Sequence, residues 1–414
     1  PCVTADAWVF TANGPRQVKD LIGGRFTTVV NGKLFPTGEK GFFKTATKAV
    51  VRLRTQEGYT LRLTTDHKIL RVANKTRYRI EREWVPAGEL KPGDQIILHN
   101  HRELKEWPGR LNEGEGYLLG LLIGDGTLKK ETAVLSVWSQ EKAVNQADGG
   151  DGTKLVMEQA WQYARTLLHR SDFAGWTAVK DRHEFRLKQA SIKILANKMG
   201  LSPGNKTITP QIEEMSSAAY RGFLRGLFDA DGTVLGTQQK GVSVRLAQSN
   251  LALLQAVQRM LLRLGIVSRI YPNRRPAGEK MLPDSRRLLK KYSVQAQHEL
   301  AISKDNLFFF AERVGFTNRD KAIKLETLLK SYQREFNRER FTATVLDITE
   351  DGVEDVYDVQ VPGVNAFDAN GLYAHNCGEQ PLSPGESCLL GSINLANMVE
   401  NGEVNWDKLK QVTV

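Results

Sequence analysis

The chain has 414 residues, of which 41% are hydrophobic and 25% are charged, as in a soluble globular protein. This length is expected to form two or three domains. No apolar run of about 18 residues occurs, and the first residues lack the basic and then apolar pattern of a secretory signal. We therefore expect a cytoplasmic protein without a membrane partner. Its three cysteines cannot form a disulfide framework, and no CxxC pair indicates a zinc site.

The net charge of +11 favours a polyanionic partner. The excess is concentrated between Arg269 and Lys291, where eight lysines and arginines accompany two acidic residues and Tyr271. A run of this kind is either a solvated loop or a contact surface for nucleic acid. The motifs described below favour nucleic acid.

Two separated parts of the chain have the pattern of β structure. Residues 2–100 contain short alternating segments such as Val50–Leu53 and Tyr59–Leu63, which Gly, Pro and Asn turns separate. Near the end of the chain the alternation returns, in Thr342–Ile348 and Val356–Val361. The sequence therefore predicts one β unit that a long insertion divides.

The intervening segment, residues 101–340, has helical periodicity and an internal duplication. Leu118–Gly126 (LLGLLIGDG) recurs 106 residues later as Leu224–Gly232 (LRGLFDADG). A second pair, His183–Leu201 and His298–Phe316, has an offset of 115 residues. Each member of this pair predicts a strand, an amphipathic helix and a closing glycine. Two matches in the same order indicate a repeat.

Each nine-residue motif predicts an apolar helix that ends in Asp-Gly. Small residues recur four positions apart in both copies, as at Gly120 and Gly124, and this spacing lets two helix backbones approach closely. Two such helices side by side would bring Asp125 and Asp231 together. That arrangement is costly unless a cation lies between the two carboxylates.

These motifs resemble those of the LAGLIDADG homing endonucleases, whose pattern ends in Asp-Ala-Asp-Gly; the second copy here ends in FDADG and the first in IGDG. The resemblance implies two pseudo-symmetric αββαββα halves whose sheets lie along the major groove of double-stranded DNA. It implies that Asp125 and Asp231 bind Mg²⁺, which activates water for cleavage of both strands. The family also places a basic residue near each metal site. Lys206 and Lys321 fit this role, with Lys304 as a rival in the second half.

Reactive residues lie at both limits of the divided β unit. The thiol of Cys2 can attack the carbonyl of Pro1 and convert the amide into a thioester, and the thiol of Cys377 can then accept the acyl group. Asn376 can attack its own carbonyl through its side-chain amide, which forms a succinimide and releases the chain that follows. His375 can protonate the leaving amine or activate the carbonyl.

This arrangement resembles an intein, a self-excising insert, over the whole span 2–376. The opening CVTADAWVFT resembles the family's first splicing block, and TTDH at residues 64–67 resembles its TxxH block. The resemblance implies that His67 destabilises the amide before Cys2 and helps to protonate its nitrogen, while Thr64 supports that geometry. It further implies a horseshoe-shaped, all-β domain of the Hint type whose two ends meet.

The last blocks of the resemblance are VYDVQVPGVNAFDANG and LYAHNC. Asp358 occupies the family's catalytic aspartate position and is implied to tune the thiols of Cys2 and Cys377. The position 11 residues before the terminal asparagine, often a histidine in this family, is Asn365 here. The usual aid to Asn376 cyclisation is therefore expected to be weakened or replaced.

The sequence thus predicts a multi-domain chain, in which an all-β splicing domain is interrupted by an α/β endonuclease. We expect host residue 1, splicing parts 2–100 and 341–376, endonuclease 101–340, and host fragment 377–414. The chain is expected to be a monomer that binds a long asymmetric DNA site in the uninterrupted host gene, and it needs no cofactor for splicing.

Joining Pro1 to Cys377 yields Pro-Cys-Gly-Glu-Gln-Pro-Leu-Ser-Pro-Gly-Glu-Ser-Cys. This junction resembles the active-site segment of ribonucleotide reductase large subunits. The resemblance implies that Cys377 is the radical-bearing cysteine and Glu379 the acid/base carboxylate of the restored host. Residues 377–414 are too few for a working reductase, so no reductase activity is expected from this chain.

Three other functions stay open at this point. The first is a DNA endonuclease whose splicing half is inactive or slow, and the second is a DNA-binding module without catalysis, which gives the paired acids no role. The third is a hedgehog-like autoprocessing domain, which shares the opening cysteine and the TxxH block but does not need the terminal His-Asn-Cys.

Overall fold

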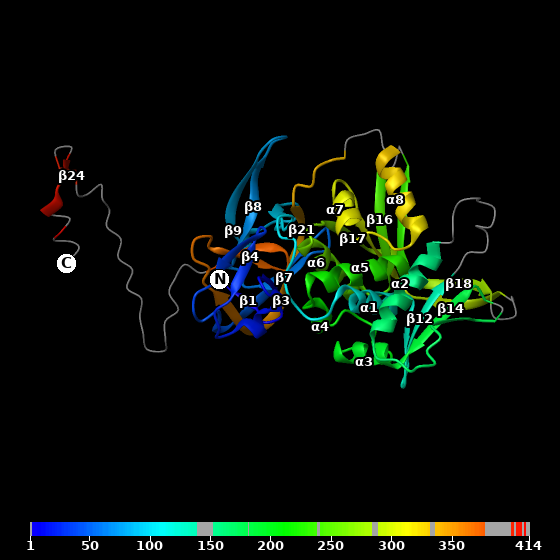
Figure 1. Ribbon diagram of the computed structural model, residues 1–414. Coiled ribbons are helices and arrows are strands. Elements are labelled where there is room, and N and C mark those ends of the chain that lie inside the picture. Colours follow the sequence, from blue (N-terminus) through cyan, green and yellow to red (C-terminus); the bar gives the residue numbers. More distant parts are fainter. Residues whose placement is uncertain are drawn as a thin grey trace. The chain divides into compact units, whose positions relative to one another are not determined.

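The computed structural model describes residues 2–138, 152–180, 182–237, 241–283, 289–331, 336–376, 399–400, 403–407 and 410 (Figure 1). Two compact units make up the chain, Pro1–Asn376 and Cys377–Val414. In the second unit, β24 (Val399–Glu400) pairs antiparallel with β25 (Glu403–Val404). None of the described helices is both long and apolar enough to span a lipid bilayer.

The first unit contains a nine-stranded sheet to which both ends of this unit contribute. Its main path has the order β1-β7-β6-β21-β10-β8-β23-β22, with β9 paired to β8, and a second sheet has the order β3-β2-β4-β5. The strands are β1 (Val3–Thr4), β2 (Trp8–Thr11), β3 (Gly14–Gln17), β4 (Thr27–Val30), β5 (Lys33–Pro36), β6 (Phe42–Thr55), β7 (Thr60–Leu63), β8 (Lys68–Lys75), β9 (Ile80–Pro86), β10 (Gln95–Ile97), β21 (Thr342–Val359), β22 (Ala366–Ala369) and β23 (Leu372–His375). Short 3-10 helices lie at Val18–Leu21 and Ala87–Glu89. Since strands from both parts alternate in one sheet, the prediction of a divided β unit is confirmed.

Two strand pairings place the ends of this β unit. Val3 on β1 lies opposite both Leu63 on β7 and Tyr357 on β21, so the first strand is held between two partners. Ile97 on β10 lies opposite Thr342 on β21. The chain therefore leaves the sheet and returns to it on neighbouring strands, and a long insertion between such close ends costs little closure entropy.

The last part of the β unit begins with one long strand. The alternation of Thr342–Ile348 and Val356–Val361 falls largely on this strand, β21, which runs unbroken from Thr342 to Val359 along β6. Its register to β6 shifts between Glu350 and Val353. Gly352 lies in this bulge with φ of 87°, a conformation that glycine adopts without strain. The polar residues around this glycine thus mark a bulge within a continuous strand.

The intervening segment forms two halves with the same order of elements. The first half consists of α1 (Glu113–Asp125), β11 (Thr127–Leu128), β12 (Ala133–Trp138), α2 (Gly152–Thr166), β13 (Trp176–Ala178), β14 (Glu184–Gln189) and α3 (Ala190–Lys198). The second consists of α5 (Ser217–Asp231), β15 (Gly232–Thr237), β16 (Gly241–Gln248), α6 (Leu251–Arg263), β17 (Ser268–Arg275), β20 (Gln297–Ile302) and α7 (Asn306–Arg313). The sheets have equivalent orders, β11-β12-β14-β13 and β15-β16-β20-β17. The predicted pair of αββαββα halves is therefore confirmed.

The second half has two additions that the repeat did not predict. A hairpin of β18 (Gly278–Pro283) and β19 (Leu289–Val294) lies between β17 and β20, and α8 (Arg319–Ser331) follows α7. The hairpin strands pair with each other and not with the four-stranded sheet, so the repeated sheet order is kept. A short helix, α4 (Pro210–Glu213), precedes α5.

The two motif helices, α1 and α5, pack with backbone against backbone. A Cβ atom added to Gly120 would lie 2.1 Å from the carbonyl oxygen of Phe223, and one added to Gly226 would lie 2.4 Å from that of Tyr117. Neither distance is possible without movement of the backbone, so glycine is required at both positions. The close approach predicted from the small residues is confirmed, and it places the ends of the two helices together.

This packing yields a stability prediction. Gly120→Ala is expected to lower the free energy of unfolding by at least about 1–3 kcal/mol, because its methyl group meets a main-chain carbonyl that cannot move alone. Gly278→Ala is the matched control, since an added Cβ there meets no atom within 4 Å and φ is not positive. Denaturant unfolding of both variants measures the difference, and equal stability of the two would contradict the assigned helix contact.

Candidate functional site

At the start of the first unit, Thr64 holds the backbone of Cys2. The Cys2 amide donates to Thr64 Oγ1 at 3.0 Å, and the Thr64 amide donates to the Cys2 carbonyl at 3.0 Å. Cys2 is 2% exposed, and its sulfur lies 2.8 Å from the hydroxyl of Thr45 on β6. The strand pairing of Val3 and these bonds together fix the reactive cysteine at one place in the sheet.

His67 lies one turn beyond Thr64 and is fully buried. Its amide donates to the Thr64 carbonyl at 3.1 Å, and its ring packs edge to face on Phe367 of β22 with centroids 6.2 Å apart. Burial is the main cause that lowers the pKa of His67 to about 3. The Cys2 backbone acts in the opposite sense and raises this pKa. His67 is therefore a neutral imidazole near neutral pH, able to accept and donate a proton.

Asp358 is buried near the end of β21, next to Tyr357, the partner of Val3 in the sheet. Burial raises the pKa of the Cys2 thiol, the hydrogen bond with Thr45 lowers it, and the charge of Asp358 raises it. The structure thus places Asp358 within electrostatic reach of Cys2. Its charge favours the thiol form and opposes the thiolate.

His375 and Asn376 lie at the end of β23. The His375 ring nitrogen Nδ1 lies 2.5 Å from the Asn376 carbonyl oxygen, and the ring meets Trp84 of β9 edge to face at 4.8 Å between centroids. Burial lowers the pKa of His375, whereas its bond to the Asn376 carbonyl raises it. The imidazole is therefore held against the carbonyl that cyclisation would attack.

Asn365, the departure from the family pattern, contacts Asn376 through its main chain. Its carbonyl accepts a hydrogen bond from the Asn376 amide at 3.2 Å, and its own φ is 51°. Asparagine tolerates this left-handed conformation better than most residues. Pro1, Cys377 and Glu379, the remaining residues assigned from the sequence, lie outside the described residues.

A buried cluster that the sequence analysis missed supports the hairpin of β22 and β23. His101 Nε2 lies 2.7 Å from the carboxylate of Asp368 on β22, and His99 Nε2 lies 3.4 Å from the Phe367 carbonyl. Each Nδ1 atom accepts a backbone amide, at 3.1 Å for His99 and 3.2 Å for His101. Both Nε2 atoms therefore carry protons, so the cluster does not offer the lone pairs that a metal needs. The only sequence signal for it is a His-x-His after a strand.

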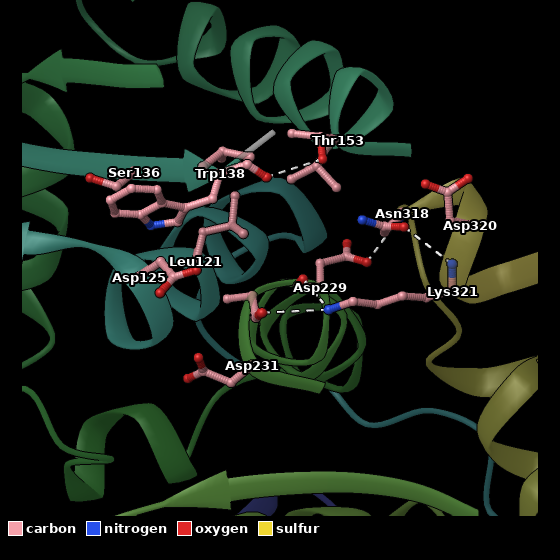
Figure 2. A pocket seen from close by; sticks show the side chains of 13 residues that line it. Leu121, Asp125, Ser136, Trp138, Thr153, Asp229, Asp231, Asn318, Asp320 and Lys321 are labelled. Atoms are coloured by element: carbon pink, nitrogen blue, oxygen red, sulfur yellow. Dashed lines mark hydrogen bonds between the residues drawn. The ribbon is translucent and has the colours of Figure 1, made fainter. Parts of the chain in front are cut away.

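A second site lies where α1 and α5 end. A cavity of about 570 Å³ is lined by 13 residues, among them Asp125, Asp231 and Lys321 (Figure 2). Asp125 and Asp231 are the last residues of their helices, as predicted, and both side chains reach this cavity. Two further carboxylates, Asp229 and Asp320, also line it.

The pKa values of both terminal carboxyls are raised. Burial, followed by the charge of Asp125, raises the pKa of Asp231 to about 6. Burial also raises the pKa of Asp125. A divalent cation with oxygen ligands fits this donor set, because it would neutralise two close carboxylates at the negative ends of two helices.

The two lysines are placed symmetrically, one at the end of each motif helix. Lys206 Nζ donates to the carbonyl of Gly126 at 2.5 Å, and Lys321 Nζ donates to that of Asp229 at 2.6 Å. Burial lowers the pKa of both lysines, while Asp125 and Asp231 raise it. Each lysine thus satisfies helix carbonyls close to the paired acids. The rival, Lys304, forms an ion pair with Glu339 and does not line the cavity.

Asp229, the first acid of FDADG, has a part that the sequence did not reveal. Its carboxylate accepts the Tyr117 hydroxyl at 2.8 Å and the backbone amides of Thr317 at 3.2 Å and Asn318 at 2.9 Å. Asp229 therefore ties α5 to the segment that precedes Lys321. The motif pattern could not show this because the partners come from a different part of the chain.

The basic stretch begins on β17 and continues into the β18–β19 hairpin. The guanidinium groups of Arg269 and Arg274 lie over the ring of Tyr271, at 5.3 and 5.5 Å from its centroid. These residues are exposed. The remaining basic residues, apart from Arg275 and Lys291, have side chains outside the described part, so the structure leaves the choice between a solvated loop and a DNA contact untested.

Comparison with known proteins identifies part of the chain. Residues 218–315 match the family described as a LAGLIDADG-like domain. Ribonucleoside-diphosphate reductase NrdEB subunit alpha of Bacillus subtilis (strain 168) is 24% identical over 449 residues, which cover 97% of this chain and 40% of the reductase. A DNA polymerase of Thermococcus hydrothermalis is 26% identical over 362 residues, which cover 80% of this chain and 19% of the polymerase. The chain therefore spans less than half the length of these relatives.

Two solved structures are also similar. A variant of the Ssp DnaB mini-intein is 13% identical, with 91% of this chain and 98% of that chain covered and a TM-score of 0.28. I-DmoI in complex with DNA and Ca is 21% identical, with 52% and 97% covered and a TM-score of 0.31.

A segment shared by proteins as different as a reductase and a polymerase has the distribution of an insertion. The reductase match covers 97% of this chain and therefore extends beyond residues 2–376. The predicted resemblance is thereby confirmed: the chain is an intein-like insertion with a LAGLIDADG domain, and it is similar in sequence to a ribonucleotide reductase over 97% of its length.

The raised pKa of Asp231 gives a test of the paired acids. The pKa of this carboxyl rises from 3.8 to about 6 on folding. At low pH the group is protonated in both states and does not change the free energy of unfolding, whereas above about pH 6 its ionised form lowers that free energy by the full amount. In metal-free protein, Asp231→Asn is therefore expected to raise the free energy of unfolding by about 1–3 kcal/mol at about pH 8 and to change it little at about pH 4.

The matched control is Asp355→Asn. Hydrogen bonds from Lys44 and Thr47 lower the pKa of this exposed carboxyl, so no stabilisation is expected. Urea unfolding at both pH values measures the effect. A gain for Asp231→Asn that is equal at both pH values, or absent at the higher one, would contradict the raised pKa of Asp231.

Proposed function

We propose that the chain excises residues 2–376 by protein splicing and that its middle segment cleaves double-stranded DNA. The splicing proposal rests above all on the two hydrogen bonds by which Thr64 holds the Cys2 backbone beside the buried His67. This geometry fixes the amide that precedes Cys2, and a neutral imidazole next to it can relay a proton.

The first two steps transfer the host residue from nitrogen to sulfur and then between sulfurs. The Cys2 sulfur attacks the Pro1 carbonyl carbon, the C–N bond breaks, and the thiol proton passes to the amide nitrogen, with His67 as the relay. The Cys377 sulfur then attacks the thioester, and its proton passes to the departing Cys2 sulfur. The charge of Asp358 raises the pKa of the Cys2 thiol and would oppose its return to the thiolate.

The last steps release the insert. The side-chain nitrogen of Asn376 attacks its own carbonyl carbon, the bond to the nitrogen of Cys377 breaks, and a proton from the amide passes to that nitrogen. His375 contacts the Asn376 carbonyl oxygen and can polarise it. The freed amine of Cys377 then attacks the thioester, which leaves a peptide bond between Pro1 and Cys377.

Intact-mass spectrometry tests the splicing reaction. Full-length protein incubated with a mild thiol at neutral pH is expected to yield an insert of 375 residues, positions 2–376, and a 39-residue peptide that joins Pro1 to residues 377–414. Asn376→Ala should block release of residues 377–414 and leave thiol cleavage before Cys2. Cys2→Ala should block thiol cleavage before residue 2 and leave the release of residues 377–414. Absence of both products from the wild-type chain would leave the β unit as a scaffold for the endonuclease.

The nuclease proposal rests on the shared cavity of Asp125 and Asp231 at the ends of two backbone-packed helices. A bound divalent cation, for which we propose Mg²⁺, would supply an activated water and stabilise the leaving oxygen. The two carboxylates would hold it, and Lys206 and Lys321 would hold the helix ends and add positive charge near the cleaved phosphate. The four-stranded sheets and the basic β17 would contact the DNA.

Plasmid cleavage tests this second activity. A supercoiled plasmid that carries the uninterrupted reductase junction is expected to be linearised with Mg²⁺, and Asp125→Asn or Asp231→Asn to lower the rate at least about a hundredfold. Cleavage should fall as the pH drops through about 6, because a protonated Asp231 no longer binds the cation. Asp355→Asn, at an exposed site outside the cavity, serves as the control. Wild-type rates in either active-site variant would overturn the metal assignment.

For the host, we propose a ribonucleotide reductase in which Cys377 and Glu379 return to the active site after splicing. The reductase match over 97% of the chain supports this proposal. A monomer in the cytoplasm is proposed with it. A hedgehog-like processing domain would show cleavage before Cys2 without ligation, so the 39-residue peptide distinguishes it from an intein.

A further inference from the structure

Thr45, a residue outside the motifs of the sequence analysis, touches the reactive sulfur. Its hydroxyl oxygen lies 2.8 Å from Cys2 Sγ and donates a hydrogen bond to the Val356 carbonyl at 3.1 Å. Thr45 comes from β6 and Val356 from β21, the two strands whose pairing organises the sheet. Of the described residues, Thr45 is the one whose side chain hydrogen-bonds the Cys2 sulfur.

The two bonds determine how the hydroxyl meets each form of the sulfur. A threonine hydroxyl has one proton and two lone pairs, so while it donates to Val356 it can accept the S–H proton of Cys2. When that proton leaves, the hydroxyl can turn from the carbonyl to the thiolate, which is a stronger, charge-assisted acceptor. Thr45 can thus bind the sulfur both before and after deprotonation.

Two features of the surroundings of this sulfur favour such a donor. Cys2 is buried, and the carboxylate of Asp358 lies within electrostatic reach, so both disfavour a negative sulfur. Lys48, on the same strand as Thr45, lowers the pKa of the Cys2 thiol through the charge of its ammonium group and forms no hydrogen bond with the sulfur. A hydrogen bond directed at the sulfur is the local interaction that can offset this cost.

We propose that Thr45 is a catalytic residue of the first splicing step, in which its hydroxyl orients the Cys2 thiol and stabilises the sulfur as it attacks the Pro1 carbonyl. This inference rests on the proposed splicing function. In the step, the Sγ–C bond forms, the C–N bond breaks and the thiol proton passes to the Cys2 nitrogen. Thr45 only rotates its own O–H bond, so the threonine itself is chemically unchanged at the end of the step.

The chain offers matched variants for the test. Thr45→Val keeps the shape and removes the hydroxyl, and Thr45→Ser restores it. Thr47→Val makes the same change two residues along β6, where the hydroxyl bonds Asp355 at 2.6 Å and not the sulfur. Both threonines are exposed, so neither substitution creates a cavity in the core.

The readout separates the two ends of the insert. Each full-length variant is incubated with a mild thiol, and intact mass reports loss of Pro1 and, separately, release of residues 377–414. Thr45→Val is expected to slow the loss of Pro1 about tenfold or more and to leave Asn376 cyclisation unchanged, while Thr45→Ser and Thr47→Val stay near the wild-type rate.

The outcomes distinguish the proposals. If the wild-type chain shows neither reaction, splicing itself fails. If it loses Pro1 and Thr45→Val does so at the same rate, the assignment of Thr45 is wrong while splicing stands. The assignment would also be overturned if Thr47→Val slowed the loss of Pro1 as much as Thr45→Val does, or if Thr45→Ser did not restore the wild-type rate. The effect would then belong to the strand and not to the Thr45 hydroxyl.

Discussion

The pairing of the short strand β1 between β7 and β21 is the constraint on which the splicing site depends. Through it Val3 meets Leu63 from the first part of the β unit and Tyr357 from the last. Cys2, one residue before, then falls beside Thr64 and Asp358. A register shift of one residue would turn every side chain of this strand to the opposite face and separate the cysteine from these groups.

The same sheet explains how one chain can carry two enzymes. Because Ile97 and Thr342 are direct partners, the endonuclease enters and leaves through neighbouring strands, and the insertion costs the β unit little closure entropy. The endonuclease has its own constraint, the contact of Gly120 with a main-chain carbonyl of α5. That contact brings two carboxylates together at a cost in stability, which a bound cation would offset.

Local patterns in the sequence revealed the features that local spacing determines. The duplicated motif predicted the paired helices, and both Asp125 and Asp231 lie where their positions in the motif imply. Partners that meet only through tertiary structure escaped prediction. Thr45 reaches Cys2 across 43 positions, and the His101–Asp368 pair spans 267, so no periodicity could have linked them. The bulge at Gly352 likewise depends on pairing with a distant strand, so the alternation pattern did not reveal it.

The central claim is that the two ends of the insert share one folded site. Nuclear Overhauser contacts in a full-length Asn376→Ala chain, which cannot release its C-terminal part, test it most directly. The account predicts cross-strand contacts between Val3 and Tyr357 and between Ile69 and Ala374, together with a His67 ring that stays neutral down to about pH 4. Absence of these contacts, with a His67 that titrates near 6.5, would contradict it.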